Sequence, residues 1–471
     1  MMPNDATYER LHARLAAAKQ EHVLRFWHAL STSERMRLAA QVEQVDPALV
    51  AQLYAKRDAA QDFRALAARA EGPPAFRLGD DRPVISREAA QRRGAEALAA
   101  GKVGAILVAG GQGSRLGFEH AKGMFPIGPV SGHSLFQILF EKLLATRRRY
   151  GAAIPLYVMT SDATHDETAA YLAEHDYFGL PAADVRLFKQ GNLPAVDAAT
   201  GQLLLEQRGS LALSPDGHGG MLQALVASGS LADMQARGLA QLFYFQVDNP
   251  LVVMCDPTFI GYHLASGSEM STQVVAKTAP DDRVGNVVSI DGKVQIIEYS
   301  DLPSECAARR NADGALALWA GSIAVHVFDT AFLARVAGTP EGLPYHVARK
   351  AAAYIDAEGN RVEPQGDEKN AIKFERFIFD LLPAARKSIV MEVDVAEAFA
   401  PVKNADGPAK DSPTTVKRQM VALHRRWLEA AGASVAADAD VEIRPTFALD
   451  AEEAARRVSL PLEVQTATLF E

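Results

Sequence analysis

The residues best suited to chemistry gather in one stretch, Val103–Pro126, which reads VGAILVAGGQGSRLGFEHAKGMFP. Its first seven residues form an apolar run with the length of a buried strand. A glycine-rich segment follows, with Arg115 inside it and Lys122 just beyond it. Because glycine permits positive φ and lacks a Cβ atom, several backbone N–H groups can converge there on one anion, close to the two cations. The stretch predicts a phosphate-binding loop at the carboxyl edge of a sheet.

Two common phosphate-binding motifs do not account for this loop. A P-loop ends in Gly-Lys-Ser/Thr, and this loop does not. The dinucleotide fingerprint comes closer, but Gly111-x-Gly113-x-x-x-Gly117 is one residue too long, and the acidic residue expected about 20 positions later is missing. A glycine-rich turn without a ligand is the remaining alternative, although such a turn needs neither the arginine nor the lysine.

Composition and charge limit the class of protein. The 471 residues are 48% hydrophobic and 23% charged, as in ordinary globular proteins, and the length allows two or three domains. The formal net charge is −9 and no long basic run occurs, so nucleic acid is not an expected partner. The N-terminus lacks the apolar core of a signal peptide, and no apolar run reaches transmembrane length. We therefore expect a cytoplasmic protein with no membrane partner.

Periodicity and turn residues predict three domains. Residues 1–100 are predicted to form an N-terminal helical domain. Residues 101–385 alternate strand and helix patterns, which predicts an α/β domain with a mainly parallel, doubly wound central sheet and helices on both faces. Residues 386–471, with a strand, a loop and a capped helix, are predicted to form a small C-terminal α+β domain.

Local signals predict the ends of several elements. Helices are expected to begin after Ser31, Asp46 and Ser86, because each residue can accept hydrogen bonds from the first turn of a helix. Asp291-Gly292, flanked by alternating runs, predicts a β-hairpin. The run KFERFIFDLL, residues 373–382, is predicted to begin a helix.

Polar residues follow the predicted strands, where ligands of parallel sheets bind. Gln190 comes after VRLFK, the Gly217–Gly220 turn after another short strand, and Asp248 after LFYFQV. A carboxylate at the end of an apolar strand could bind a metal, or could cap a helix or turn because Pro250 follows. The residues alone leave both interpretations of Asp248 open.

The loop sequence resembles a known signature. L-x-A-G-G-x-G-x-R-L-G followed by a lysine is similar to the loop of sugar-1-phosphate nucleotidylyltransferases. LVAGGQGSRLG with AKGM more closely resembles the eukaryotic-type UDP-N-acetylglucosamine pyrophosphorylases, which have proline where this chain has Ala121. Further similar motifs occur in the family's order between about residues 80 and 432: FKQGNLPA, SPDGHGG, FQVDN, IIEYSD, AGSIAVH, FIFD and APVKNADG.

The resemblance implies a Rossmann-like nucleotide-diphospho-sugar transferase fold and a uridylyltransferase activity. UTP and a sugar 1-phosphate, first N-acetylglucosamine 1-phosphate, would give a UDP-sugar and pyrophosphate, with Mg²⁺ or Mn²⁺ as cofactor. A UTP–glucose-1-phosphate uridylyltransferase, or a broad UDP-sugar pyrophosphorylase, is the alternative within the family. A catalytically inactive nucleotide-sugar-binding regulator is the alternative from another class. A monomer or homodimer is expected.

The resemblance also assigns roles by position. The residues expected to act on the phosphates are Arg115, Lys122 and Lys403. The expected nucleotide-binding residues are Ala109, Gly110, Gly111, Gly113, Gln190, which reads the uracil edge, and Gly217. Asp248 is expected to bind the metal, and the sugar-binding set is His218, Asp248, Asn249, Glu298, Ser322, Phe377 and Phe379.

Two positions depart from the acetylglucosamine pattern. His218 stands where those enzymes have asparagine, and glucose-1-phosphate uridylyltransferases have histidine in the corresponding turn. Ser322 replaces another sugar-contacting asparagine. These departures concern the identity of the sugar rather than the uridylyl transfer.

Overall fold

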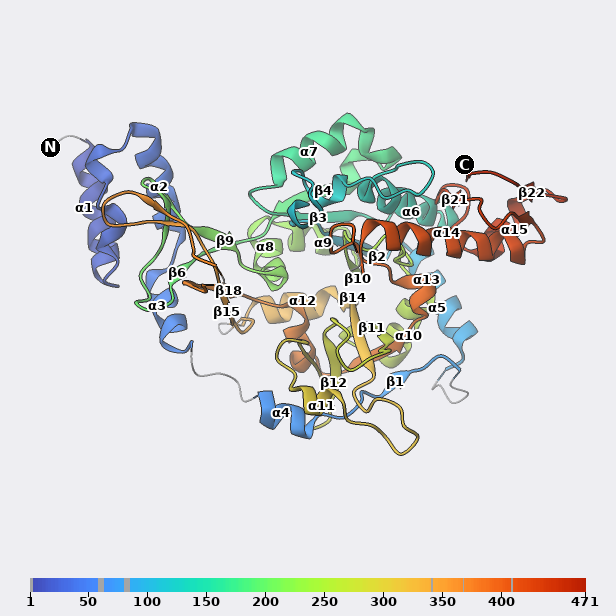
Figure 1. Cartoon of the computed structure of the whole chain (residues 1–471). Coiled ribbons are helices and arrows are strands. Elements are labelled where there is room, and N and C mark those ends of the chain that lie inside the picture. Colours follow the sequence, from blue (N-terminus) through green and yellow to red (C-terminus); the bar gives the residue numbers. More distant parts are fainter. Residues whose placement is uncertain (1–2, 58–62, 80–84, 340–341, 367, 408–409) are drawn as a thin grey trace. The chain divides into compact units, whose positions relative to one another are not determined.

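The computed structural model describes residues 3–57, 63–79, 85–339, 342–366, 368–407 and 410–471, which form two compact units (Figure 1). The small unit comprises Met1–Asp62, Gln190–Met221 and Leu343–Asp380, and the large unit comprises Phe63–Lys189, Leu222–Gly342 and Leu381–Glu471. Each unit thus combines three separate stretches of chain. The division into three sequential domains stays a prediction.

A ten-stranded sheet forms the centre of the large unit, with the path β1-β19-β11-β14-β10-β2-β3-β4 and the hairpin β12–β13 attached to β14. Every neighbouring pair on this path is parallel except the two pairs that β14 makes. The mainly parallel α/β prediction is therefore confirmed. The strands are β1 (Ala75–Phe76), β2 (Val103–Val108), β3 (Leu156–Thr160), β4 (Val185–Lys189), β10 (Gln241–Gln246), β11 (Met270–Ala276), β12 (Asn286–Ile290), β13 (Lys293–Ile297), β14 (Ala320–Asp329) and β19 (Ser388–Glu392).

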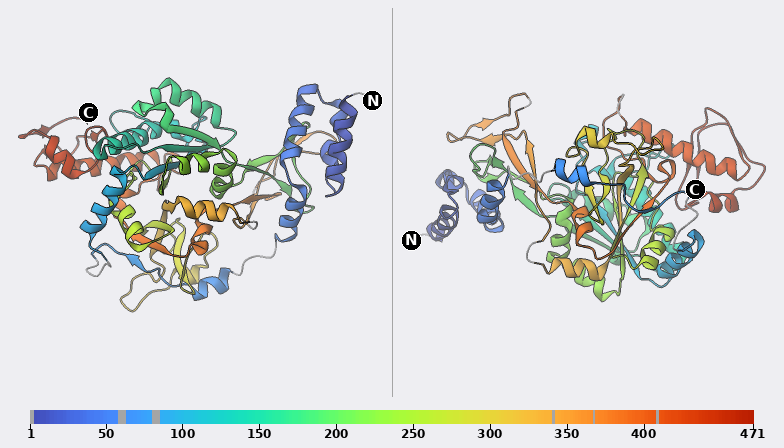
Figure 2. Two further views of the ribbon diagram at one scale, coloured as in Figure 1. Left: turned by 180° about the vertical axis from the view of Figure 1, so that it is seen from behind. Right: turned by 90° about the horizontal axis from the view of Figure 1, so that it is seen from below.

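Burial on both faces explains why β2 reads as a continuous apolar run. Val103, Ala105 and Leu107 join one core cluster with residues of α5 (Arg87–Ala99), α6 (Leu135–Tyr150) and α10 (Pro257–Ser266). Ile106 points to the opposite face and is fully buried as well. Figure 2 gives two further views of this sheet and its helices. The carboxyl ends of β2, β3, β4 and β10 share one edge, because these strands are parallel.

The local signals for helix starts and for the hairpin are confirmed. Ser31 forms a capping box with Glu34 at α2 (Thr32–Gln44), and Asp46 caps α3 (Pro47–Ala55). Ser86 caps α5. Asp291 and Gly292, with φ of 52° and 76°, form the turn between β12 and β13, where a two-residue hairpin needs positive φ.

The helix predicted from residue 373 is wrong at its beginning. Residues Ala371–Glu375 form β18, which pairs with β15 (His346–Lys350) and β6 (Val196–Asp197), and only the 3₁₀ segment η8 (Ile378–Ala384) follows. Ile372 and Phe374 both point into the core of the small unit. That spacing of two is the period of a strand, and it outweighs the helical appearance of the run.

The small unit packs short helices against short strands. Its core includes Leu11, Trp27, Leu38, Val196 and Phe374. The remaining elements of this unit are α1 (Pro3–Ala16), η1 (Glu21–Leu24), η2 (Trp27–Ala29), β5 (Asn192–Pro194), β7 (Leu205–Gln207), β8 (Ser210–Leu211), β9 (Leu213–Pro215), η7 (His218–Gly220), β16 (Tyr354–Ile355) and β17 (Arg361–Val362).

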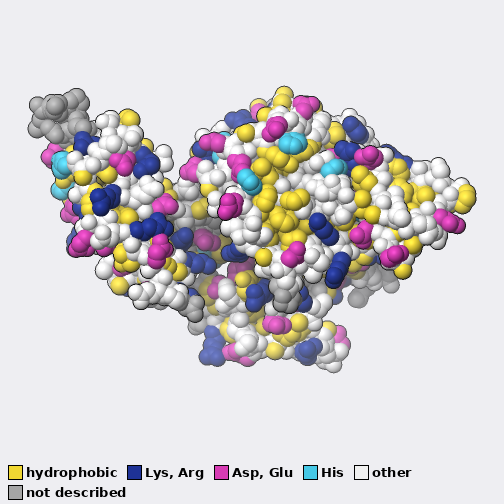
Figure 3. Space-filling model, turned by 45° about the horizontal axis from the view of Figure 1, so that its top comes forward, with side chains coloured by type: hydrophobic (Ala, Val, Ile, Leu, Met, Phe, Trp, Pro, Cys, Tyr) yellow, Lys and Arg dark blue, Asp and Glu magenta, His cyan; other side chains and the backbone are white. Residues whose placement is uncertain are grey.

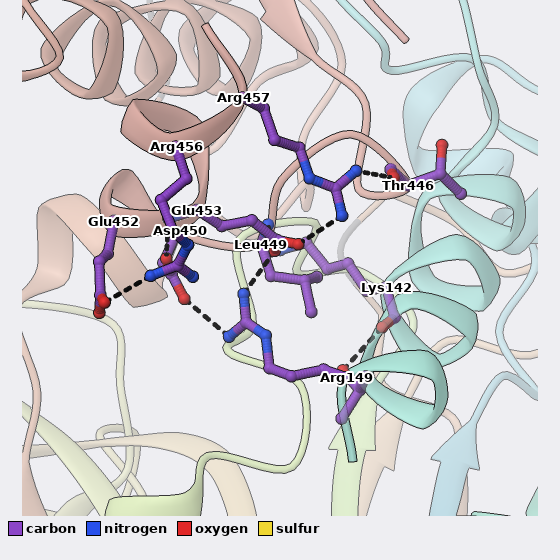
Figure 4. Close-up of polar contacts among 10 residues, drawn as sticks. Lys142, Arg149, Thr446, Leu449, Asp450, Glu452, Glu453, Arg456 and Arg457 are labelled. Atoms are coloured by element: carbon purple, nitrogen blue, oxygen red, sulfur yellow. Dashed lines mark hydrogen bonds and ion pairs between the residues drawn. The ribbon is translucent and has the colours of Figure 1, made fainter. Parts of the chain in front are cut away.

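The C-terminal elements are tied to α6 by ion pairs. Arg149, at the end of α6, contacts both Asp450 and Glu453 (Figure 4). Nearer the start of α6, Arg444 contacts both oxygens of the buried Glu141 carboxylate. The elements of this region are α13 (Val395–Ala398), α14 (Pro413–Ala430), β20 (Ser434–Val435), β21 (Val441–Ile443), α15 (Ala451–Arg457), β22 (Glu463–Val464) and β23 (Thr468–Phe470).

The other helices of the large unit are short or connect strands. They are α4 (Phe63–Arg69), η3 (Ser114–Leu116), η4 (Lys122–Met124), α7 (His165–Glu174), η5 (Asp176–Gly179), η6 (Ala182–Asp184), α9 (Ser230–Ala236), α11 (Ser304–Ala307) and α12 (Thr330–Ala337), with α8 (Met221–Ala227) beginning at the last residue of the small unit's second stretch. Among the described residues, no helix combines the length and the apolar character needed to cross a membrane. Basic and acidic side chains are interspersed on the face drawn in Figure 3.

Candidate active site

The glycine-rich loop leaves β2 and is closed by its own backbone. Gly113 N–H donates to His120 O (2.9 Å), and Lys122 N–H donates to Gly111 O (3.0 Å). Ser161, which follows β3, donates from Oγ to Gly110 O (2.8 Å). The loop is thus held at the shared carboxyl edge of β2 and β3, as the sequence predicted.

The closed loop leaves a set of backbone donors uncommitted. The N–H groups of Gly110, Gly111, Gln112, Ser114 and Arg115 donate to no group among the residues that the structure describes. A Cβ atom on Gly111 would meet nothing within 4 Å, and the φ of Gly111 is not positive. Nothing in the described chain therefore requires glycine at position 111. An anion that approaches the backbone closely would require it, because a Cβ atom would stand in its way.

Lys122 and Asp248 meet at the end of this loop. Lys122 Nζ lies 3.6 Å from Asp248 Oδ2, and the two side chains are 17% and 14% exposed. Asp248 follows β10 by two residues, and its carboxylate accepts no hydrogen bond from the backbone of the described residues. The structure therefore does not give Asp248 the capping role that its sequence left open.

The segment that carries Lys403 is attached to the end of β10. Val402 N–H donates to Asp248 O (2.8 Å). The Asn249 side chain is 3% exposed, donates from Nδ2 to Ala398 O (2.8 Å) and accepts at Oδ1 from Ala400 N–H (3.0 Å). These bonds bring Lys122, Asp248 and the Lys403 segment together within the large unit. They also occupy the Asn249 amide, so its observed contacts are those of a positioning residue.

Asp411 is a charged neighbour that the motifs did not identify. Its carbonyl accepts from the N–H groups of Lys403 (2.8 Å) and Asn404 (3.2 Å), and its own φ is 63°. Burial raises the pKa of the Asp411 carboxyl, the positive charge of Lys403 opposes this rise, and the negative charge of Asp248 adds to it. The only sequence signal was a Lys-Asp pair shortly after KNADG.

Glu298 and Ser322 both lie close to Gly285 in the large unit. A Cβ atom on Gly285 would lie 3.1 Å from Glu298 Oε1 and 3.8 Å from Ser322 Cβ. Ser322 N–H donates to Gly285 O (2.8 Å), and β14 is irregular here, with Ala324 at φ 55°. Irregularities of this kind re-aim side chains next to active sites. The two predicted sugar-binding residues are thus brought together.

In the small unit, Gln190 presents an uncommitted amide. The residue is only 9% exposed, yet its side chain forms no hydrogen bond within the described part of the chain. Neither amide atom is completely buried, so both can be reached from outside the chain. An accessible and uncommitted amide at the end of β4 fits the predicted contact with a base.

Close packing within the chain explains why glycine occupies positions 217 and 219 of the SPDGHGG turn. Gly217 has φ 83°, and a Cβ atom there would lie 2.4 Å from Arg376 O. Gly219 N–H donates to the same carbonyl (2.8 Å), and the buried side chains of Asp216 and Arg376 form an ion pair. The turn is therefore fixed against the segment that carries Phe377 and Phe379.

His218 is a neutral donor in this arrangement. Its Nδ1 accepts from Ile378 N–H (3.1 Å), and its ring lies 5.3 Å from Phe377 and 5.6 Å from Phe379. Burial, followed by the charge of His346, lowers the pKa of His218 to about 4. With Nδ1 acting as acceptor, the neutral ring carries its proton on Nε2 and can donate one further hydrogen bond. The predicted sugar-binding residues His218, Phe377 and Phe379 thus form one cluster.

The oxygen ligands available near the loop fit a divalent cation that is held partly by the protein and partly by the phosphates of a substrate. Among the described residues, no three histidine, cysteine, aspartate or glutamate side chains are grouped to bind a metal ion. Mg²⁺ at nucleotide sites is usually held by one or two carboxylates, water and substrate phosphates. Asp248, beside a loop of free N–H donors, can supply one such carboxylate.

The fold and the glycine loop are those of a nucleotidyltransferase, and comparison with known proteins leads to the same class. Residues 76–450 match the family described as UTP–glucose-1-phosphate uridylyltransferase. The chain belongs to this family.

Individual relatives agree over most of the chain. A UDP-N-acetylhexosamine pyrophosphorylase-like protein 1 of Xenopus tropicalis is 37% identical, covering 94% of this chain and 89% of the relative. The UDP-N-acetylglucosamine pyrophosphorylase of Saccharomyces cerevisiae is 38% identical, with 75% of each chain covered. The crystal structure of a protein from Entamoeba histolytica, described as a putative UDP-N-acetylglucosamine pyrophosphorylase, superposes with a TM-score of 0.75 and 32% identity, covering 84% of this chain and all of that one.

Proposed function

We propose that this uridylyltransferase makes UDP-N-acetylglucosamine and pyrophosphate from UTP and N-acetylglucosamine 1-phosphate. The observation that carries the proposal is the glycine loop with uncommitted N–H donors and the Lys122–Asp248 pair beside it. The names of the relatives that span most of the chain support the acetamido sugar.

In the proposed reaction, a phosphate oxygen of the sugar 1-phosphate attacks the α-phosphorus of UTP, and the bond to the pyrophosphate oxygen breaks. Two anions must approach each other, so catalysis depends on positioning and charge neutralisation more than on acid–base chemistry. Arg115 and Lys122 hold the triphosphate with the uncommitted N–H groups of the loop, such as those of Gly110 and Gly111. The N–H groups of Ala109 and Gly113 are bonded to Met159 O and His120 O, so these two residues would line the nucleotide without donating to it. Lys403 neutralises the reacting phosphates.

Asp248 would hold the divalent cation, Mg²⁺ or Mn²⁺. The cation would neutralise charge on the phosphates and orient them for displacement. Lys122, only 3.6 Å from the same carboxylate, keeps the local charge balanced before substrate binds.

The remaining residues recognise the base and the sugar. Gln190 would pair with the uracil edge, since an amide can donate to and accept from a base. Gly217 would contact the nucleotide, while Glu298, Ser322, His218, Phe377 and Phe379 would contact the sugar. For Asn249 we propose a positioning role, because its amide is bonded to the backbone before Lys403.

A preference for glucose 1-phosphate is the second candidate, and His218 with Ser322 supports it. Both residues depart from the asparagines of the acetylglucosamine pattern. A cytoplasmic location and a monomeric or homodimeric state stay predictions.

The experiment that tests the proposal measures pyrophosphate release by the purified full chain with UTP, Mg²⁺ and one sugar 1-phosphate at a time. We expect N-acetylglucosamine 1-phosphate to give the highest kcat/KM. A higher value for glucose 1-phosphate would favour the second candidate. No release with any sugar would support a binding protein without turnover.

A further inference from the structure

One side-chain pair beside the aromatic cluster of the small unit has a member, His346, that lies outside every motif that predicted the site, whereas its partner Asp380 ends the FIFD motif. His346, the first residue of β15, has its Nε2 atom 2.7 Å from Asp380 Oδ2. The side chains are 23% and 17% exposed. The pair joins the start of β15 to η8, two segments that are separated by more than thirty residues of sequence.

The His346 ring also packs on Phe377. Their ring centroids are 4.4 Å apart, a shorter distance than any other between rings of this cluster. Phe377 in turn lies 5.3 Å from His218 and 5.0 Å from Phe379. Phe377 is therefore the central ring, with His346 against it and the two other predicted sugar contacts also touching it.

Phe377 is held by Gly219 along its main chain, where an added Cβ atom would lie 2.6 Å from Phe377 N, and by neighbouring rings at its side chain. It lies between β18 and η8, outside either element, and it is only half-buried, whereas Ile378 and Phe379 are buried. Asp380 N–H donates to Phe377 O (3.2 Å), so the residue that holds His346 is also bonded to the Phe377 backbone. His346 and Asp380 thus restrict Phe377 from its ring and from its main chain.

We propose that His346, held by Asp380, is a positioning residue that fixes Phe377 and, through it, the aromatic wall of the sugar subsite. The proposal deepens the proposed function and rests on it for the identity of the ligand. His346 does not need to touch the substrate: it keeps the Phe377 ring in the single orientation that contacts His218 and Phe379. A general stabiliser of β15 would instead affect folding and both substrates equally.

Two variants separate the ring of His346 from its hydrogen bond. His346→Gln keeps a donor that can reach Asp380 but removes the ring, and His346→Phe keeps a ring but removes the donor. His12→Gln, in α1 of the same unit, is the matched control. We expect His346→Gln to raise KM for N-acetylglucosamine 1-phosphate about 2- to 10-fold, the size expected for one lost aromatic contact.

KM for UTP and the melting temperature should change little in His346→Gln, and His346→Phe should recover part of the lost sugar affinity. The proposal is overturned if KM for the sugar phosphate stays at the wild-type value. It is also overturned if KM for both substrates and the melting temperature change together, because that pattern indicates a structural role.

A crystal structure of His346→Gln beside one of the wild type tests the positioning without any turnover. We expect the Phe377 ring to change rotamer or to adopt several in the variant, and an unchanged single rotamer would overturn the proposal. If the wild type released no pyrophosphate but the ring moved, the proposed function would fail while the positioning role stood.

Discussion

Lys122 Nζ lies 3.6 Å from Asp248 Oδ2 at the edge where β2 and β10 end side by side. Lys122 follows the glycine loop, and Asp248 lies two residues beyond the end of the neighbouring strand β10. An ammonium group in this position can bind a phosphate oxygen of the triphosphate. The neighbouring carboxylate can bind the cation that accompanies the triphosphate. The charge arrangement of the proposed reaction centre therefore exists before any substrate binds.

Replacing Lys122 with methionine should lower kcat about 100- to 1,000-fold, the usual cost of removing one group that stabilises developing negative charge. The fold should survive, because methionine fills most of the volume of the lysine side chain and the change removes one ion pair, that with Asp248 at 3.6 Å. Pyrophosphate release and the melting temperature give the two readouts. Lys293→Met, at an exposed position of the β12–β13 hairpin, is the control. Near-normal turnover in Lys122→Met would exclude the lysine from the mechanism.

Asp248→Asn should change the dependence on the divalent cation. The amide keeps the shape of the side chain but loses the charge that a hard cation needs. We expect the Mg²⁺ concentration for half-maximal rate to rise at least several-fold and kcat to fall, while UTP still binds. A titration curve that superposes on that of the wild type would make Asp248 structural.

His218 should make the small unit less stable in mild acid. Its pKa is about 4 in the folded chain, against an ordinary value of 6.5 for histidine exposed to water, so the unfolded chain binds the proton first as pH falls. Stability should be fully present above pH 6.5 and fall by at most about 1.4 kcal/mol per pH unit down to about pH 4. Urea unfolding at several pH values should give a flatter dependence for His218→Asn than for the wild type. Parallel curves would contradict a buried neutral histidine.

Sugar choice should depend on His218 and Ser322. Asparagine at 218 can place its oxygen where Nδ1 accepts from Ile378 N–H, so the double change to asparagine should fold. It supplies amides that can bond to an acetamido group. We expect kcat/KM for N-acetylglucosamine 1-phosphate relative to glucose 1-phosphate to rise about 5-fold or more, within the range for one buried polar contact. An unchanged ratio would assign the specificity to Glu298 and the Phe377 wall.

The sequence predicted local structure best where a short pattern is compatible with one kind of element. The run before Ala109 had to be a buried strand, and Ser31, Asp46 and Ser86 cap the helices they were expected to cap. The run from residue 373 was misassigned because its short strand is followed, two residues later, by a 3₁₀ segment. A window that averages over both parts hides the period of two.

The motifs identified site residues that lie within short stretches of the family pattern. They missed residues whose role depends on a contact with a distant part of the chain. Asp411 and His346 are recognised only through contacts with Lys403 and Phe377, which the fold creates. The glycines of the Gly217 turn were expected to approach a ligand, which stays a prediction; the structure adds that Gly217 and Gly219 pack closely against the backbone of Arg376, which the sequence did not indicate. Contacts between distant segments are what single-sequence patterns cannot specify.

The most direct test of the proposed reaction is a competition in one tube. The purified chain receives limiting UTP with Mg²⁺ and equal concentrations of N-acetylglucosamine 1-phosphate and glucose 1-phosphate, and mass spectrometry quantifies the two UDP-sugars. We expect UDP-N-acetylglucosamine to predominate, with one pyrophosphate released for each UDP-sugar formed. Predominance of UDP-glucose, or the absence of both products, would contradict it.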